Sequence, residues 1–178
     1  MSLKALGRRT RRAIALAVGA AVVVAAAPGT GSATLQLTEY GPRAGFSFDP
    51  DQFVFGAFAD WGELAPLVHL RSSADIGLGN DFFTFILNGD VTYHFPVAPS
   101  SPVQFYAGGG LAFVYLDYDA PDIPGVTIDF DTSTTDIGVN QALGVEKDLG
   151  GYKNGHLELR IGLVDAPDIK VMAGLGFF

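Results

Sequence analysis

The feature of this sequence that most restricts its fold is an alternation of apolar and polar residues with a period of two. Around residues 82–95, aromatic and aliphatic residues occupy every second position, and the positions between them are mostly polar: Thr84, Ile86, Asn88, Asp90, Thr92 and His94. Such a period places alternate side chains on opposite faces of a β-strand. The pattern recurs around residues 67–78, 133–147 and 156–164, and no stretch after residue 33 shows sustained helical periodicity. The sequence therefore predicts an all-β protein.

Clusters of Gly, Pro, Asp and Asn separate the alternating segments and mark the turns between them. They divide the chain into eight expected strands: Arg43–Phe48, Phe53–Trp61, Leu67–Leu78, Phe82–Phe95, Val103–Asp119, Ser133–Lys147, His156–Val164 and Ile169–Phe178. An even number of strands joined by hairpins suits an up-and-down barrel, because closure of the sheet removes both exposed edges. We therefore predict an eight-stranded antiparallel up-and-down β-barrel.

The two faces of the strands indicate which kind of barrel forms. Four strands have one apolar face and one face that carries charges, and two of these polar faces mix both signs, as at Glu158 and Arg160. Aromatic residues gather near both ends of the apolar faces, as in the interfacial girdles of a lipid-embedded barrel. The expected lipid-facing girdle residues are Trp61, Phe83, Tyr93, Phe95, Phe105, Tyr115 and Phe177. This pattern favours a transmembrane barrel, and a soluble β-protein with its charged face in water is the alternative.

The first 33 residues are typical of a secretory signal peptide. Residues 1–12 are basic, residues 13–27 form an unbroken apolar run, and Gly31–Ala33 offers the small residues of a cleavage site. The apolar run is shorter than the ~18–20 residues that a membrane-spanning helix needs. We therefore expect a signal peptide at 1–33, export of the chain, and an outer-membrane β-barrel domain at 34–178.

Composition excludes several classes of function. The chain has no cysteine, so it has neither disulfides nor a thiolate nucleophile or metal ligand. Five of its eleven Lys and Arg residues lie in the first twelve positions, which leaves six to face 19 Asp and Glu residues. Such an acidic chain would repel nucleic acid rather than bind it.

Three motifs accompany the leader: Arg43–Phe46, the Gly-rich stretch Tyr106–Leu111, and the terminal Gly174–Phe178. With these the chain resembles the small outer-membrane β-barrel family, which includes the OmpA membrane domain and OmpX. The resemblance implies a barrel in the Gram-negative outer membrane, surrounded by lipid. It also implies that the barrel-assembly machinery reads the C-terminal strand through a terminal aromatic residue on the lipid face. The apolar phase here ends on Phe177 and leaves Phe178 out of phase, so either a bulge restores the phase or Phe177 is the anchor.

The acidic residues gather at one end of the expected barrel. If both chain termini are periplasmic, the longest connection, 120–132, lies outside the cell. It is flanked by an acidic outer rim, a candidate site for a divalent cation or a surface ligand: Asp117, Asp119, Asp129 and Asp131. Ca²⁺ needs six or more oxygen ligands, and the spacing is not that of an EF-hand. We therefore favour a solvated acidic surface, and expect no metal site or cofactor.

The charged faces predict an interior charge network. Its expected members are Arg43, Arg71, Asp75, Asp90, Asp136, Glu146, Glu158, Arg160 and Lys170. Every buried charge needs a partner, and side chains fill the lumen of an eight-stranded barrel. We expect a closed polar plug, with a proton or ion path through the same residues as the alternative.

The histidines and serines give little sign of further chemistry. His69, His94 and His156 all fall on the inward phase without a His-x-His pair, which favours hydrogen-bonded interior histidines over a metal site. Ser73 lies roughly 13 Å along the strand from His69, too far for a catalytic pair. We predict a non-enzymatic outer-membrane barrel with a structural or surface-interaction role. The alternatives are a soluble exported periplasmic barrel that binds an apolar ligand, and a lipid-modifying outer-membrane enzyme.

Overall fold

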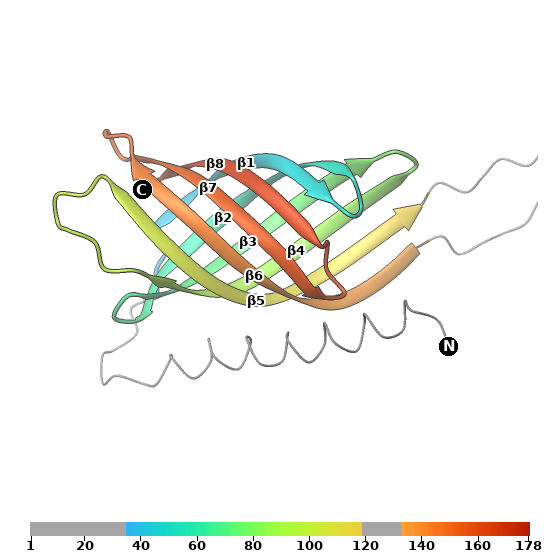
Figure 1. The fold of residues 1–178 in the computed structure, drawn as a ribbon, viewed down its shortest axis with the longest axis horizontal. Helices are drawn as coiled ribbons and strands as arrows, with labels where there is room; N and C mark the ends of the chain where they lie inside the picture. The colour runs from blue at the N-terminus through green and yellow to red at the C-terminus, as the bar shows by residue number, and fades with distance from the viewer. Residues whose placement is uncertain (1–34, 119–132) are drawn as a thin grey trace, which may run out of the picture.

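The computed structural model describes residues 35–118 and 133–178, which form eight antiparallel strands closed into one barrel (Figure 1). The strands are β1 (Glu39–Phe48), β2 (Gln52–Ala65), β3 (Val68–Gly79), β4 (Phe82–His94), β5 (Val103–Tyr118), β6 (Ser133–Asp148), β7 (Lys153–Val164) and β8 (Ile169–Phe177). Each strand pairs with the next, and β8 closes the barrel by pairing with β1 from Tyr40↔Phe177 to Phe48↔Ile169. The predicted eight-stranded up-and-down barrel is confirmed. The expected signal peptide at 1–33 lies outside the described residues.

Three strands extend beyond their predicted ends by three or four residues. β1 begins at Glu39 rather than Arg43, β2 continues past Trp61 to Ala65, and β7 begins at Lys153 rather than His156. Gly and Pro in these stretches resemble turn residues in sequence, but the strands continue through them because neighbouring strands supply pairing. Pro42, for example, lies opposite Ala57 of β2.

The two ends of the barrel differ, and we name them by their connections (Figure 1). The termini rim carries Leu35, Phe178 and the connections at 66–67, 95–102 and 149–152. The loop rim carries the connections at 49–51, 80–81 and 165–168, together with the far ends of β5 and β6. β5 and β6 reach farthest at the loop rim, because the first six residues of β6 pair with β5 alone and β7 joins only at Val139.

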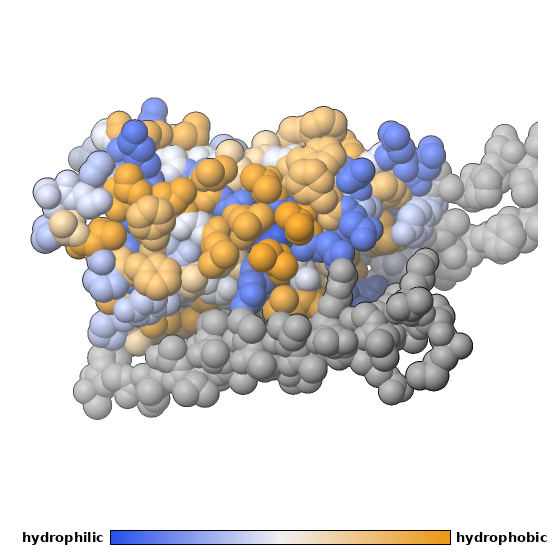
Figure 2. Space-filling view, in the orientation of Figure 1, coloured by the Kyte–Doolittle hydropathy of each residue, from blue (hydrophilic) through white to orange (hydrophobic). Residues whose placement is uncertain are grey.

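Polar side chains point into the barrel, and apolar side chains point outward. Among the described residues, eighteen buried side chains are polar or charged and eight are apolar or aromatic. The exposed side chains include Phe53, Phe55, Leu111, Ile137 and Leu157, each more than half exposed. Figure 2 shows apolar side chains over much of the visible face, with hydrophilic residues at both ends and in places between the apolar ones. This is the reverse of a water-soluble fold.

Six of the seven expected girdle residues lie on the outward phase of their strands, and the seventh, Phe95, is an exposed residue that directly follows the end of β4. Phe83 and Tyr115 lie near the loop rim, and the others lie near the termini rim: Trp61, Tyr93, Phe95, Phe105 and Phe177. Trp61 donates its indole N–H to Ser72 Oγ at 2.8 Å, so its polar atom has a partner on the outer surface. Within 35–118 and 133–178 no helix is long and apolar enough to cross a membrane, which has no bearing on strands.

Candidate functional site in the barrel interior

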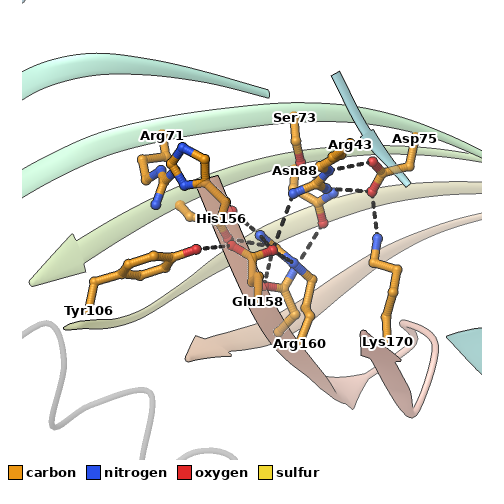
Figure 3. Close-up of polar contacts among 12 residues, drawn as sticks. Arg43, Arg71, Ser73, Asp75, Asn88, Tyr106, His156, Glu158, Arg160 and Lys170 are labelled. Carbon is orange, nitrogen blue, oxygen red and sulfur yellow. Dashed lines mark hydrogen bonds and ion pairs between the residues drawn. The ribbon is translucent and has the colours of Figure 1, made fainter. Parts of the chain in front are cut away.

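Arg160 of β7 lies at the centre of the interior polar contacts (Figure 3). Its guanidinium forms a two-pronged ion pair with Asp90 of β4, with Nη1–Oδ1 at 3.0 Å and Nη2–Oδ2 at 2.8 Å. Nη1 also donates to Asn140 Oδ1 at 2.8 Å, and Nη2 donates to Glu158 Oε1 at 3.0 Å. The planar, forked guanidinium can serve several acceptors at once. Arg160 thereby joins β4, β6 and β7 across the lumen.

A second group of contacts centres on Asp75 of β3. Arg43 of β1 donates from Nε to Asp75 Oδ1 at 2.8 Å and from Nη2 to Oδ2 at 2.6 Å. Lys170 of β8 donates from Nζ to the same Oδ2 at 2.5 Å. Arg43 Nη1 lies 3.2 Å from Glu158 Oε1, so Glu158 connects this group to Arg160. The Asp75 side chain has no exposed surface.

Tyr106 of β5 extends the contacts toward the termini rim. Its hydroxyl donates to Glu158 Oε2 at 2.8 Å, and the guanidinium carbon of Arg71 lies 4.5 Å from the centre of its ring. Arg71 Nη1 donates to Glu146 Oε1 at 2.9 Å. The cross-strand neighbour of Tyr106 is Gly144, where an added Cβ would collide with the tyrosine ring. A glycine is therefore needed at 144 to give the ring its place.

Two further carboxylates at the termini rim have histidine partners. His156 Nε2 lies 2.5 Å from Glu39 Oε1, and its Nδ1 lies 3.3 Å from Glu146 Oε1. His69 Nδ1 lies 3.1 Å from both carboxylate oxygens of Asp60. Each of these buried acids thus has a partner that can donate a hydrogen bond or carry positive charge.

Four Arg and Lys side chains in the interior form ion pairs with four carboxylates. We call the following residues the charge network: Arg43, Arg71, Asp75, Asp90, Glu146, Glu158, Arg160 and Lys170. It holds four cations and four carboxylates, all buried and all in ion pairs. Two cavities beside Arg43, Phe58 and Arg71 measure ≈ 10 Å³ each. A volume of that size is about what one water molecule needs, so side chains fill this level of the barrel.

The prediction that Asp136 belongs to the interior charge network is wrong. Asp136 shares the inward phase of Asn140 but is exposed. The physical reason is that Asp136 lies in the part of β6 that projects past β7 at the loop rim, where it faces Val114 of β5. Among the described residues β7 does not cover this part of β6, and the Asp136 side chain is exposed.

Sequence reasoning missed three interior residues, Glu39, Asp60 and Tyr106. It placed Asn88 and Asn140 on the polar faces of their strands but did not include them in the network. Glu39 lay outside the predicted strand. Asp60 lies on a strand whose two faces are both largely apolar up to Ala59, so alternation did not show its direction. The inward direction of Tyr106 could have been predicted, because it follows the outward Phe105 and successive strand residues point to opposite faces.

The predicted acidic outer rim is only partly described. Asp117 lies near the end of β5, where it pairs with Ser133 of β6. The other three members, Asp119, Asp129 and Asp131, lie outside the described residues. The cation or surface ligand expected at this rim therefore stays a prediction.

Solved structures share this fold. The N-terminal β-barrel domain of OprF from Pseudomonas aeruginosa aligns with a TM-score of 0.57 and 17% identity, over 78% of this chain and 94% of that one. Neisserial surface protein A aligns with a TM-score of 0.56 and 15% identity, over the same shares of the two chains. No protein-family model and no curated protein sequence matches the chain. The fold is thus that of the small outer-membrane β-barrels, as the resemblance of the sequence predicts.

Proposed function

We propose that this chain is an integral outer-membrane β-barrel with a structural or surface-interaction role, a closed lumen and no catalysis. The observation that carries the proposal is the reversed arrangement of its faces, with charges inside and large apolar side chains outside. In water, each Å² of that apolar surface would cost about 25 cal/mol relative to an apolar environment. A bilayer core removes this cost, and the charge network removes the need for water inside.

Export is part of the proposal. Residues 1–33 would act as the signal peptide, and residues 34–178 would form the mature barrel. With both termini in the periplasm, the termini rim would face the periplasm and the loop rim the outside of the cell. The acidic residues around the loop rim would then meet the external medium, where a divalent cation or a surface ligand could bind them.

The interior argues against the two other functions considered. A soluble exported barrel for an apolar ligand needs an apolar lumen, whereas this lumen contains the charge network. A lipid-modifying enzyme needs a nucleophile and a base beside the lipid face. Ser73 Oγ points inward and accepts hydrogen bonds from Arg43 and Asn88, while His69 contacts Asp60.

A gel of cell fractions, with and without boiling, tests the proposal. Cells that express the full chain should yield a band in the outer-membrane fraction, and its mobility should change on boiling. A closed barrel with all its strands paired resists detergent until it is heated, which gives this shift. Recovery in the soluble periplasm with no shift would contradict the proposal and favour the exported ligand-binding barrel.

The C-terminal strand provides a further prediction, on assembly. The pairings of β8 with β7 and β1 contain no register shift, and Phe177 continues the outward phase of Val171 and Leu175. Phe178 follows the strand end. If the barrel-assembly machinery reads Phe177, Phe177→Ala should reduce the heat-modifiable band severalfold. The matched control, Phe178→Ala, should leave it near the wild-type amount, and equal losses would contradict the assignment.

A further inference from the structure

We propose that the termini rim contains a binding site for one divalent transition metal of the zinc class, formed by Asp60, His69 and His94. This inference goes beyond the structural role proposed above and does not depend on where the protein resides. It also departs from the expectation that the interior histidines are only hydrogen-bonded.

The strand register brings these three residues together from three neighbouring strands. Asp60 lies opposite Arg71, and His69 lies opposite Thr92, which places His94 diagonally next to His69 on the same inward face. One ligand atom from each residue lies within 4.8 Å of the other two. β2 contains register shifts between Asp60 and Ala65, and such bulges often re-aim side chains at functional sites.

His94 provides the observation that points to a ligand. Its side chain is more than nine-tenths buried, and among the described residues its Nε2 has no hydrogen-bond partner. A buried polar atom without a partner is costly and rare. His94 lies beside a second imidazole and a carboxylate, and this is the donor set that zinc takes in open sites with three protein ligands.

The site requires one ring to turn when metal binds. The His69 and His94 rings are stacked, with centroids 4.1 Å apart and an interplanar angle of 13°. Two parallel rings cannot both direct an in-plane lone pair at the same ion. His69 is the ring that can move, since its side chain is 22% exposed and its present partner, Asp60, is itself a proposed ligand. Glu63 lies at the mouth of the site, with Oε1 3.8 Å from His69 Nε2, and can supply the fourth ligand.

A second group of potential ligands, Glu39, Glu146 and His156, also lies at this rim. Most of its donor atoms are already engaged; His156 Nδ1 has no hydrogen-bond partner among the described residues and lies 3.3 Å from Glu146 Oε1. Arg71 donates to Glu146 at 2.9 Å, and His156 Nε2 contacts Glu39 at 2.5 Å. A metal ion there would have to displace a buried guanidinium. This group therefore serves as the internal control for the proposed site.

Zinc titration of the purified barrel tests the proposal. The full chain is expressed with a tag that contains no histidine, purified in detergent, stripped of metal and titrated with zinc chloride by calorimetry. We expect one zinc ion per chain. His94→Phe keeps an aromatic ring for stacking but removes the ligand, and it should weaken binding by at least about 10-fold. His156→Gln, in the second group, should leave the affinity unchanged.

Cobalt absorption of the wild-type barrel keeps the proposal testable if His94→Phe fails to fold. Co²⁺ bound by two imidazoles and a carboxylate in a four-coordinate site should give visible absorption bands, and zinc should abolish them. Absence of binding to the folded wild-type barrel would overturn the proposal. So would zinc binding that is unchanged in a folded His94→Phe barrel. Neither result would affect the heat-modifiability test of the proposed function.

Discussion

Replacing Asp75 with Asn is expected to lower the free energy of unfolding of the barrel by about 3–5 kcal/mol. The amide keeps the shape of the carboxylate but removes the charge that holds both Arg43 and Lys170. Arg43 retains Glu158 at 3.2 Å, whereas Lys170 loses the carboxylate charge that lies 2.5 Å from its Nζ. Breaking a buried ion pair costs this much because a charge stays behind without compensation. Urea unfolding of the purified barrel, followed by fluorescence of the single tryptophan, Trp61, measures the loss.

Asp136→Asn is the matched control, because the same chemical change is made at an exposed position outside the charge network. It should alter the free energy of unfolding by no more than about 0.5 kcal/mol. Adding Lys170→Met to Asp75→Asn should restore part of the stability, since it removes the unpaired cation. Equal effects at Asp75 and Asp136 would contradict the ion pairing described for the interior.

Replacing Leu159 with Arg is expected to destabilise the barrel in a bilayer by about 2–4 kcal/mol. Leu159 lies in the middle of β7 on the outward face, between Leu143 of β6 and Val171 of β8. An arginine there would place a charge in hydrocarbon, surrounded by apolar neighbours. Unfolding of the barrel in lipid vesicles, compared with wild type, measures the cost.

The control for Leu159→Arg is the same replacement at Tyr152, which is 81% exposed in the connection between β6 and β7. Tyr152→Arg, at the end of the barrel where the membrane meets water, should lower the free energy of unfolding by only about 0–1 kcal/mol. In a barrel surrounded by water, Leu159→Arg would be a surface change worth no more than about 0.5 kcal/mol. A change of that small size for Leu159→Arg in vesicles would therefore contradict the assignment of this face to lipid.

Alternation predicted the directions of most strand residues but failed where a strand passes the end of the barrel. Eight of the nine predicted charges lie in the interior, because a period of two is a property of the strand itself. Asp136 has the correct phase, but among the described residues β7 does not pair with β6 at its level. The face to which a residue points can be read from the sequence. The residue of β6 at which pairing with β7 begins cannot, because it depends on how the two strands align.

The contact between the stacked rings of His69 and His94 was not predicted from the sequence. The two histidines lie 25 residues apart and form no local motif. They become neighbours because the short turn at 80–81 fixes the register of β3 against β4, so that His69 lies opposite Thr92. Register follows from hairpin geometry, and that geometry could have been used to predict the stacked pair.

The sequence by itself determined the number of strands, their order and, for the strands that alternate clearly, which face is apolar, because these depend on turns and alternation within short stretches. The tertiary structure alone decided which charges meet. Arg43 of β1 binds Asp75 of β3, Arg160 of β7 binds Asp90 of β4, and Lys170 of β8 reaches the same Asp75. These partners lie on strands that are not neighbours in the sheet. They come into contact only because closure and stagger of the strands bring distant side chains to the same height across a narrow lumen.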